Sequence, residues 1–99
     1  MTLHLSLKEK WFRMIASGEK KEEYRELTDY WYKRLTDGGV IKHFDEVHFT
    51  LGYPKADDAE RHMTRRITDI TIGTGNPAWG AEEGKQYFII KLEPLTHDP

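Results

Sequence analysis

The sequence contains no cysteine, and this absence excludes three kinds of structure and chemistry. Without thiols the chain has no disulfide scaffold, no thiolate metal site and no cysteine nucleophile. Long apolar runs are also missing, because no stretch approaches the roughly twenty apolar residues that a membrane helix needs. The N-terminal MTLHLSLKEKW lacks a long apolar run after a basic start, so we expect no signal peptide. We therefore expect a cytoplasmic protein without a membrane partner.

A strong excess of charge is missing as well. The formal net charge is −2 at pH 7, which is too close to zero for broad electrostatic attraction to nucleic acid. The distribution is uneven, because residues 1–44 carry nine Lys and Arg against seven Asp and Glu, whereas residues 45–99 carry six against ten. A local basic patch in the first half therefore stays compatible with the sequence.

Motifs for metals and nucleotide cofactors are absent too. No histidine pair has the spacing of a helical zinc site, although a site assembled from separate strands stays open on spacing alone. Gly73-x-Gly75 reads as a turn, because no helix opens after it as a dinucleotide fingerprint requires. We expect neither a metal nor a cofactor. The histidines are His4, His43, His48, His62 and His97.

Aromatic and charged residues are abundant in the 99-residue chain, at 12% and 32%. This length supports one small domain, which we place at residues 1–99. Residues 3–7 alternate between apolar and polar side chains, as a half-buried strand does. Residues 8–17 have the apolar stripe of a helix, and Gly18 is suited to end it. The stripe consists of Trp11, Phe12, Met14 and Ile15. The chain is then expected to extend over residues 20–27.

A second short helix is expected over residues 29–35, capped by Thr28 or Asp29 and ended by Gly38-Gly39. Three strands should follow, and the long middle one needs a bend or bulge where its alternation breaks. Their ranges are 44–52, 61–72 and 86–95. About five strands and two helices near the N-terminus predict an α+β fold built as a small, mixed, mostly antiparallel β-barrel.

The stretch GEKKEEYRE at residues 18–26 packs seven charged residues and one tyrosine into nine positions. In an extended segment Glu23 and Arg25 share a face, so the carboxylate can orient the guanidinium. Lys20 has the opposite parity, but a turn at Gly18 could redirect it to the same opening. Its neighbours Lys21 and Arg25 favour a neutral lysine amine, which is a competent base or nucleophile.

Spacing alone leaves two simpler interpretations open. The stretch could be a solvated strand face with an ion pair worth well under about 1 kcal/mol. It could also belong to a structural or interaction module, in which Glu23 and Arg25 form a closed pair with no cavity beside them. An open pocket flanked by Lys20 would count against that second interpretation.

Gly18-x-Lys20-x-x-Glu23-x-Arg25, placed after an apolar helix and before an aromatic-rich one, resembles the signature of the ASCH family. The stretches HFTLGY and ITDITIGTGNPAWGAEEGKQYFIIKL also resemble the later strands of small ASCH proteins, so the resemblance covers nearly the whole chain. It implies a small PUA-like β-barrel, a role with RNA or another nucleic acid, and a ligand cleft lined by the motif.

Members of that family differ in activity, and some are described as ribonucleases or as binding domains. One bacterial branch of similar size hydrolyses the acetyl amide of acetylated cytidine with the motif lysine, a nearby threonine and a distant glutamate. Lys20 and Arg25 match the motif lysine and arginine. Glu23 stands where that branch has its threonine.

Further candidates lie outside the motif. Tyr53 and Trp79 stand beside glycines in loops and could stack on bases, at roughly 1–3 kcal/mol per base, or could plug the ends of the barrel. Three arginines could contact phosphates or form ordinary strand surface, and two glutamates could supply a distant carboxylate or serve a turn. These five residues are Arg61, Arg65, Arg66, Glu82 and Glu83.

Two functions follow from these residues. The first is a domain that binds RNA, single-stranded nucleic acid or a modified nucleoside, with Glu23 orienting Arg25. The second is a small hydrolase, a ribonuclease or an amidohydrolase on acetylated cytidine, with Lys20 as base and Glu23 or a later carboxylate completing the relay. The expected ligand-binding residues are Lys20, Lys21, Glu23, Arg25, Tyr53 and Trp79.

Overall fold

The computed structural model describes residues 1–95, which form one five-stranded sheet, a small hairpin and two helices. The strand order in the sheet is β1-β5-β6-β7-β2, and only β1 and β5 run parallel. The predicted α+β class with a mostly antiparallel sheet is therefore confirmed. The strands of the sheet are β1 (Thr2–Leu7), β2 (Glu22–Glu26), β5 (Glu46–Leu51), β6 (His62–Thr74) and β7 (Gln86–Leu92).

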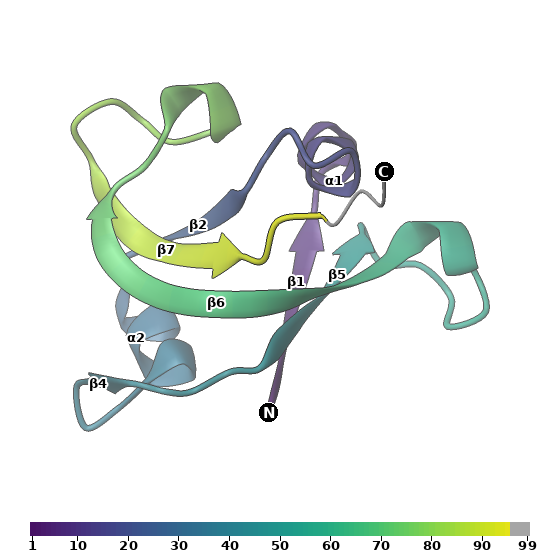
Figure 1. Cartoon of the computed structure of the whole chain (residues 1–99). Helices are drawn as coiled ribbons and strands as arrows, with labels where there is room; N and C mark the ends of the chain where they lie inside the picture. Colours follow the sequence, from purple (N-terminus) through teal and green to yellow (C-terminus); the bar gives the residue numbers. More distant parts are fainter. Residues whose placement is uncertain (96–99) are drawn as a thin grey trace.

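The sheet curls into a half-barrel because the long strand β6 bends. Its first half pairs with β5 and its second half with β7, and the register shifts between Ile67 and Asp69. A bulge of this kind increases the local twist. Figure 1 shows β6 sweeping around the molecule so that β7 and β2 curl over the other strands. The predicted bulge is confirmed, and the predicted barrel takes the form of a half-barrel with β1 and β2 as its edges.

Both predicted helices form near the N-terminus. Helix α1 (Glu9–Ala16) turns Phe12 and Ile15 into the core, as its apolar stripe predicts. Helix α2 (Asp29–Leu35) begins at Thr28, whose hydroxyl oxygen accepts the backbone N–H of Trp31. Within the described part of the chain, neither helix has the length and apolar character needed to cross a membrane.

The glycine pair that was predicted to end the second helix has another role. Helix α2 already ends at Leu35, and the chain continues into an antiparallel hairpin of two short strands. Gly38 and Gly39 form its turn with φ angles of +59° and +85°, which suit a two-residue hairpin turn. The prediction was wrong here because this turn needs glycines for the same positive φ that ends helices. The hairpin strands are β3 (Thr36–Asp37) and β4 (Val40–Ile41).

The main core fills the inner face of the half-barrel. Alternate residues of β1 and β5 point inward, because successive side chains of a strand lie on opposite faces. Ile70, Phe88 and Ile90 meet them from β6 and β7, and the helices add further apolar side chains. The inward residues of the first two strands are Leu3, Leu5, Leu7, Val47, Phe49 and Leu51.

A second, smaller apolar cluster lies on the outer face of β2 and β7. Tyr24 and Ile89 pair across these strands and pack with Tyr87 and Ala81. The loop between β6 and β7 folds over them, and its short 3-10 turn η2 (Pro77–Trp79) brings Trp79 against the cluster. The other 3-10 turn, η1 (Ala59–Arg61), leads into β6.

Gly75 allows this loop to pack closely, and its substitution tests the arrangement. A Cβ at Gly75 would lie 2.7 Å from the Ala81 Cβ and 2.8 Å from the Tyr24 ring, whereas at Gly73 it would meet only the Ile89 Cδ1 at 3.4 Å. We expect Gly75→Ala to lower the free energy of unfolding by about 1–3 kcal/mol. Gly73→Ala is the matched control and should change it little. Urea denaturation measures both, and equal stability of the two variants would contradict this packing.

Candidate functional site

A cleft of about 960 Å³ lies beside the charged stretch 18–26. The end of β1 and the start of α1 form one wall, and β2 forms another. The turn that carries Gly52 and Tyr53, together with η2, completes the rim. Lys20, Glu23 and Arg25 all line this cleft. The motif therefore flanks an open cavity, which counts against the closed structural pair. The burial of Lys20 and Glu23 counts against a solvated strand face.

Lys20 is turned into this cleft by the end of α1. Gly18 has a φ of +86°, and the backbone N–H of Lys20 donates to the Met14 carbonyl at 2.9 Å. The lysine is only 2% exposed. Its Nζ donates to Glu23 Oε1 at 2.9 Å and to the Trp79 carbonyl oxygen at 2.6 Å. A turn at Gly18 thus redirects Lys20 to the same opening as Glu23, as predicted.

The surroundings of Lys20 bear on its protonation. Its Nζ lies 4.4 Å from the centre of the Trp11 ring and 5.6 Å from that of Tyr24. Burial lowers the pKa of the Lys20 ammonium from its ordinary value of 10.5, because the charged form loses solvation. The Glu23 carboxylate partly offsets this effect, and the Arg25 guanidinium adds to it. The predicted shift has the right direction, but burial rather than neighbouring positive charge is its main cause.

Glu23 connects the two cations of the motif. On β2 it pairs with Ile90 of β7, which places its side chain on the inner face beside the apolar core. It is 5% exposed, and a carboxylate buried to this degree needs charged or hydrogen-bonding partners. Oε1 contacts Lys20, and Oε2 contacts Arg25 Nη2 at 2.8 Å. One buried anion therefore fixes the positions of both cations.

Arg25 joins the two edge strands of the half-barrel. Its Nη2 also donates to the Ser6 carbonyl of β1 at 3.1 Å, and its Cζ lies 5.2 Å from the centre of the Trp31 ring. The contacts to Glu23 and Ser6 both use Nη2, which leaves Nη1 for a ligand. The Nε–H is buried and has no acceptor among the described residues. The guanidinium is thus held firmly while part of its donor capacity is unused.

The two predicted stacking residues both line the cleft but differ in exposure. Tyr53 is 97% exposed, so it plugs no end of the barrel and presents its ring to solvent. Trp79 is half-buried because it packs on the outer cluster, while its carbonyl group holds Lys20. Tyr53 therefore offers a free aromatic face, and Trp79 offers a ring fixed by packing.

Lys21 was predicted to bind the ligand but does not line the cleft, whereas Arg61 does. Lys21 is exposed and does not line the cleft, because it follows Lys20 on the opposite side of the chain and its carbonyl group accepts the Leu92 N–H. Arg61 lines the cleft from η1 and pairs with Asp58 at 3.2 Å. The structure thus adds a cation at the rim and leaves Lys21 outside.

The other arginines of this region serve the fold. Arg65 donates to the carbonyl groups of Ile15 at 3.0 Å and Glu93 at 2.6 Å, so it ties α1 to the segment after β7. Arg66 lies 3.7 Å from the Glu93 carboxylate on the surface. Neither lines the cleft. Of Arg61, Arg65 and Arg66, only Arg61 is therefore placed to contact a phosphate in this cleft.

The distant carboxylates considered for Lys20 lie elsewhere. Glu82 and Glu83 are exposed in the turn that precedes β7, and Glu82 lies 3.8 Å from Lys85. Neither lines the cleft, so the turn role applies to both. The carboxylate beside Lys20 is Glu23.

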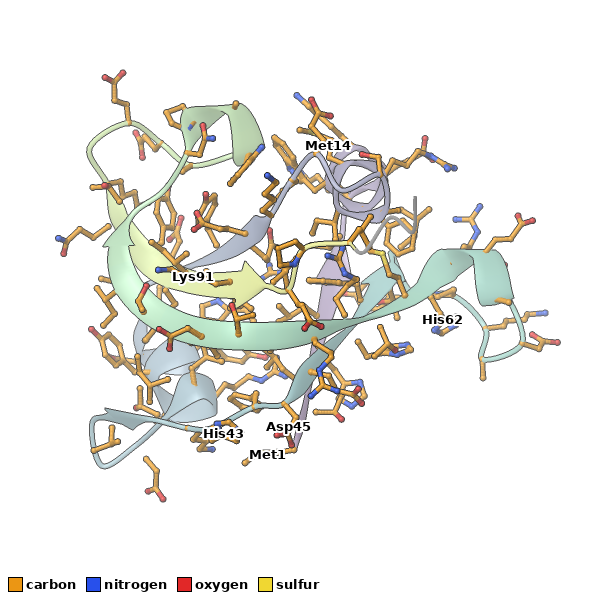
Figure 2. The ribbon with its side chains drawn as sticks, in the orientation of Figure 1. Met1, Met14, His43, Asp45, His62 and Lys91 are labelled. Carbon is orange, nitrogen blue, oxygen red and sulfur yellow. The ribbon has the colours of Figure 1, made fainter. Side chains whose placement is uncertain are left out.

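The histidines form one cluster but no metal site in the described part of the chain. His48 and His62 are joined by a hydrogen bond of 2.9 Å between ring nitrogens, and His4 packs near His48 with ring centres 5.7 Å apart. Figure 2 shows His43 beside Met1 and Asp45, at the opposite end of the molecule from Met14 on α1. Among residues 1–95 no group of three or more histidine or acidic side chains is arranged to hold a metal. His97 lies outside the described residues.

Sequence reasoning missed two residues beside the motif cations. Trp11 was assigned to the apolar stripe of the helix, yet its ring lines the cleft against Lys20. Arg34 lies 5.1 Å from the centre of the Trp31 ring, on which Arg25 also packs. Nothing in the local pattern marks either residue, because both roles depend on which elements the fold brings together.

Comparison of the chain with models of known protein families found no match. A comparison with curated proteins found none, and neither did a comparison with solved structures. Membership of the ASCH family and a PUA-like barrel therefore stay predictions from the sequence.

The buried ion pair predicts unequal effects of two similar substitutions. Glu23→Gln leaves the cation of Lys20 buried without a charged partner, so we expect the free energy of unfolding to fall by about 3 kcal/mol. Glu26→Gln is the matched control on the same strand, since Glu26 forms an exposed pair with Lys85 and should matter little. Urea denaturation measures both variants. Comparable losses would contradict the central place of Glu23.

The lowered pKa of Lys20 can be measured by NMR titration of its amine. We expect a midpoint below 10.5, because burial favours the neutral form. Between that midpoint and 10.5 the unfolded chain binds more protons at this site, so its contribution to stability rises with pH. Lys20→Met should remove that rise in denaturation measurements across the interval. A midpoint at or above 10.5 would exclude a general-base role for Lys20.

Proposed function

We propose that this protein binds RNA or a modified nucleoside in the cleft beside residues 18–26. The observation that carries the proposal is the arrangement of Lys20 and Arg25 on one buried carboxylate inside an open cleft. Cations held in this way meet a ligand in fixed positions, so binding does not have to order them. The resemblance of the motif to the ASCH signature supports the same function.

The size of the cleft supports a ligand of nucleoside dimensions. Its volume of about 960 Å³ lies at the upper end of the range of roughly 300–1,000 Å³ that is typical of small-molecule sites. Aromatic rings and charged side chains both line it, which suits a ligand that combines an aromatic base with polar oxygens. Tyr53 and Trp79 supply aromatic faces for a base, and Arg61 adds a cation at the rim.

The donors of Lys20 and Arg25 suit the oxygens of a base, a ribose or a phosphate. Glu23 and Trp79 use two of the three N–H donors of the Lys20 ammonium, and the third has no oxygen acceptor among the described residues. Arg25 contributes Nη1, because its contacts to Glu23 and Ser6 among the described residues both use Nη2. Because the chain as a whole carries a charge of −2, recognition rests on this local geometry.

A second candidate function is hydrolysis in the same cleft, as a ribonuclease or an amidohydrolase on acetylated cytidine. The observation that favours it is the lowered pKa of Lys20 beside Glu23. A neutral Lys20 amine would accept a proton from water as the hydroxide oxygen adds to the acetyl carbon. The C–N bond then breaks, and the proton returns to the departing cytidine amine.

The test compares binding and turnover in the same samples. RNA and acetylated cytidine are incubated with wild type, Lys20→Met and Arg25→Gln, and both bound ligand and product are measured. We expect binding to weaken about ten- to hundredfold in each variant, because each loses a hydrogen bond from a charged group. Lys21→Met is the matched control, since it removes the same charge from outside the cleft. Lys20→Ala adds a variant without the side-chain volume.

Each outcome decides between the candidates. Binding by wild type without product supports a binding domain and overturns the hydrolase. Product that disappears in Lys20→Met, while that variant remains folded and Lys21→Met still forms product, establishes the enzyme. Folded wild-type protein that binds neither RNA nor acetylated cytidine would overturn both functions, and so would variants that bind as tightly as Lys21→Met.

A further inference from the structure

A second cleft of about 420 Å³ adjoins the first along the edge of the half-barrel. It lies among β1, α2 and β5, and its walls include His4, Tyr30, Arg34 and His48. Ser6, Arg25 and Tyr53 line both clefts, so these three residues form the boundary between them. A ligand longer than the first cleft would therefore pass over Arg25 and Tyr53 into the second.

The two clefts differ in charge. The first contains the carboxylates of Glu9, Glu23 and Glu26, whereas no aspartate or glutamate lines the second. Arg34 has no carboxylate within 4.0 Å among residues 1–95; its donors reach the Tyr30 hydroxyl and the His4 carbonyl group. The positive charge of Arg34 is thus not neutralised by a carboxylate within the described chain, which suits an anionic ligand group.

The guanidinium groups of Arg25 and Arg34 both pack against the ring of Trp31. The Cζ atoms of Arg25 and Arg34 lie 5.2 and 5.1 Å from the centre of this one ring. Because Trp31 is occupied by the arginines, the exposed rings of Tyr30 and Tyr53 are the faces that can stack on bases. Arginines together with exposed aromatic rings are typical of a groove that binds single-stranded nucleic acid.

Resting on the proposed function, we infer that the ligand is a single-stranded oligonucleotide whose chain crosses from the first cleft into the second. One nucleoside occupies the cleft beside Lys20, and the next phosphate crosses at Arg25. The following nucleotide lies in the second cleft, with its base against Tyr30 or Tyr53 and its phosphate at Arg34. A free nucleoside has no phosphate and leaves the second cleft unused.

The test measures how affinity depends on ligand length. The probes are the four ribonucleosides, acetylated cytidine, and homo-oligomers of two and four nucleotides, titrated against the full chain. For at least one of the four bases, we expect the homo-oligomers to bind tenfold or more tightly than the matching nucleoside. The reason is that one further base stacks and a phosphate is bound. Arg34→Gln should remove most of this gain and leave nucleoside affinity unchanged.

Lys33→Gln is the matched control. Lys33 precedes Arg34 in the last turn of α2, is exposed and lines neither cleft, so the same loss of charge there should keep the gain. If Arg34 binds one phosphate, the slope of log affinity against log salt should be smaller in magnitude by about 0.7 in Arg34→Gln than in wild type. Thermal denaturation confirms that each variant is folded. If Arg34→Gln does not fold, Arg34→Lys, which keeps the charge, replaces it.

The outcomes separate this inference from the proposed function. The two-cleft path is wrong if oligomers bind no more tightly than the nucleoside, or if the gain in affinity survives in Arg34→Gln. Either result leaves the nucleoside site intact. If wild type binds no nucleoside and no oligomer, both the path and the proposed function are wrong.

Discussion

The buried carboxylate of Glu23 is the constraint on which the site depends. It lies on the inner face of β2, next to the apolar core, where an unpaired charge would be costly. Lys20 and Arg25 neutralise it from two directions, and each continues to another element. Lys20 reaches η2 through the Trp79 carbonyl group, and Arg25 reaches β1 through that of Ser6. One anion thus ties the end of α1, the outer loop and the open edge of the half-barrel together.

The proposed binding role falls to the same side chains that connect the elements of the fold. In the described sheet β1 and β2 are the two edges, each paired with one strand only, and Arg25 connects them through the Ser6 carbonyl group. A sheet closed by backbone pairing would have no cleft there. Because side chains make this connection, cations and aromatic rings line the opening. The proposed binding function uses the same feature that holds the fold closed.

Much of the fold followed from local patterns. The alternation in residues 3–7 and 44–52 predicted β1 and β5, and the broken alternation within residues 61–72 predicted a bend or bulge in β6. The glycine pair at 38–39 was misread, because helix ends and hairpin turns both require positive φ. The curl of the sheet and the order of its strands could not be read locally, since pairing partners far apart in the chain decide them.

For the site, the sequence determined the shared face of Glu23 and Arg25 and a glycine at the turn before Lys20, because strand periodicity and backbone freedom are local properties. Only the tertiary structure decided that Lys20 is buried, that Lys21 lies outside the cleft, and that Trp11 and Arg34 accompany the motif cations. Burial and the charge of a cleft depend on side chains from β1, α1, α2 and η2 that are distant in sequence. Their positions are fixed when the sheet curls and the core packs, which is a property of the whole chain.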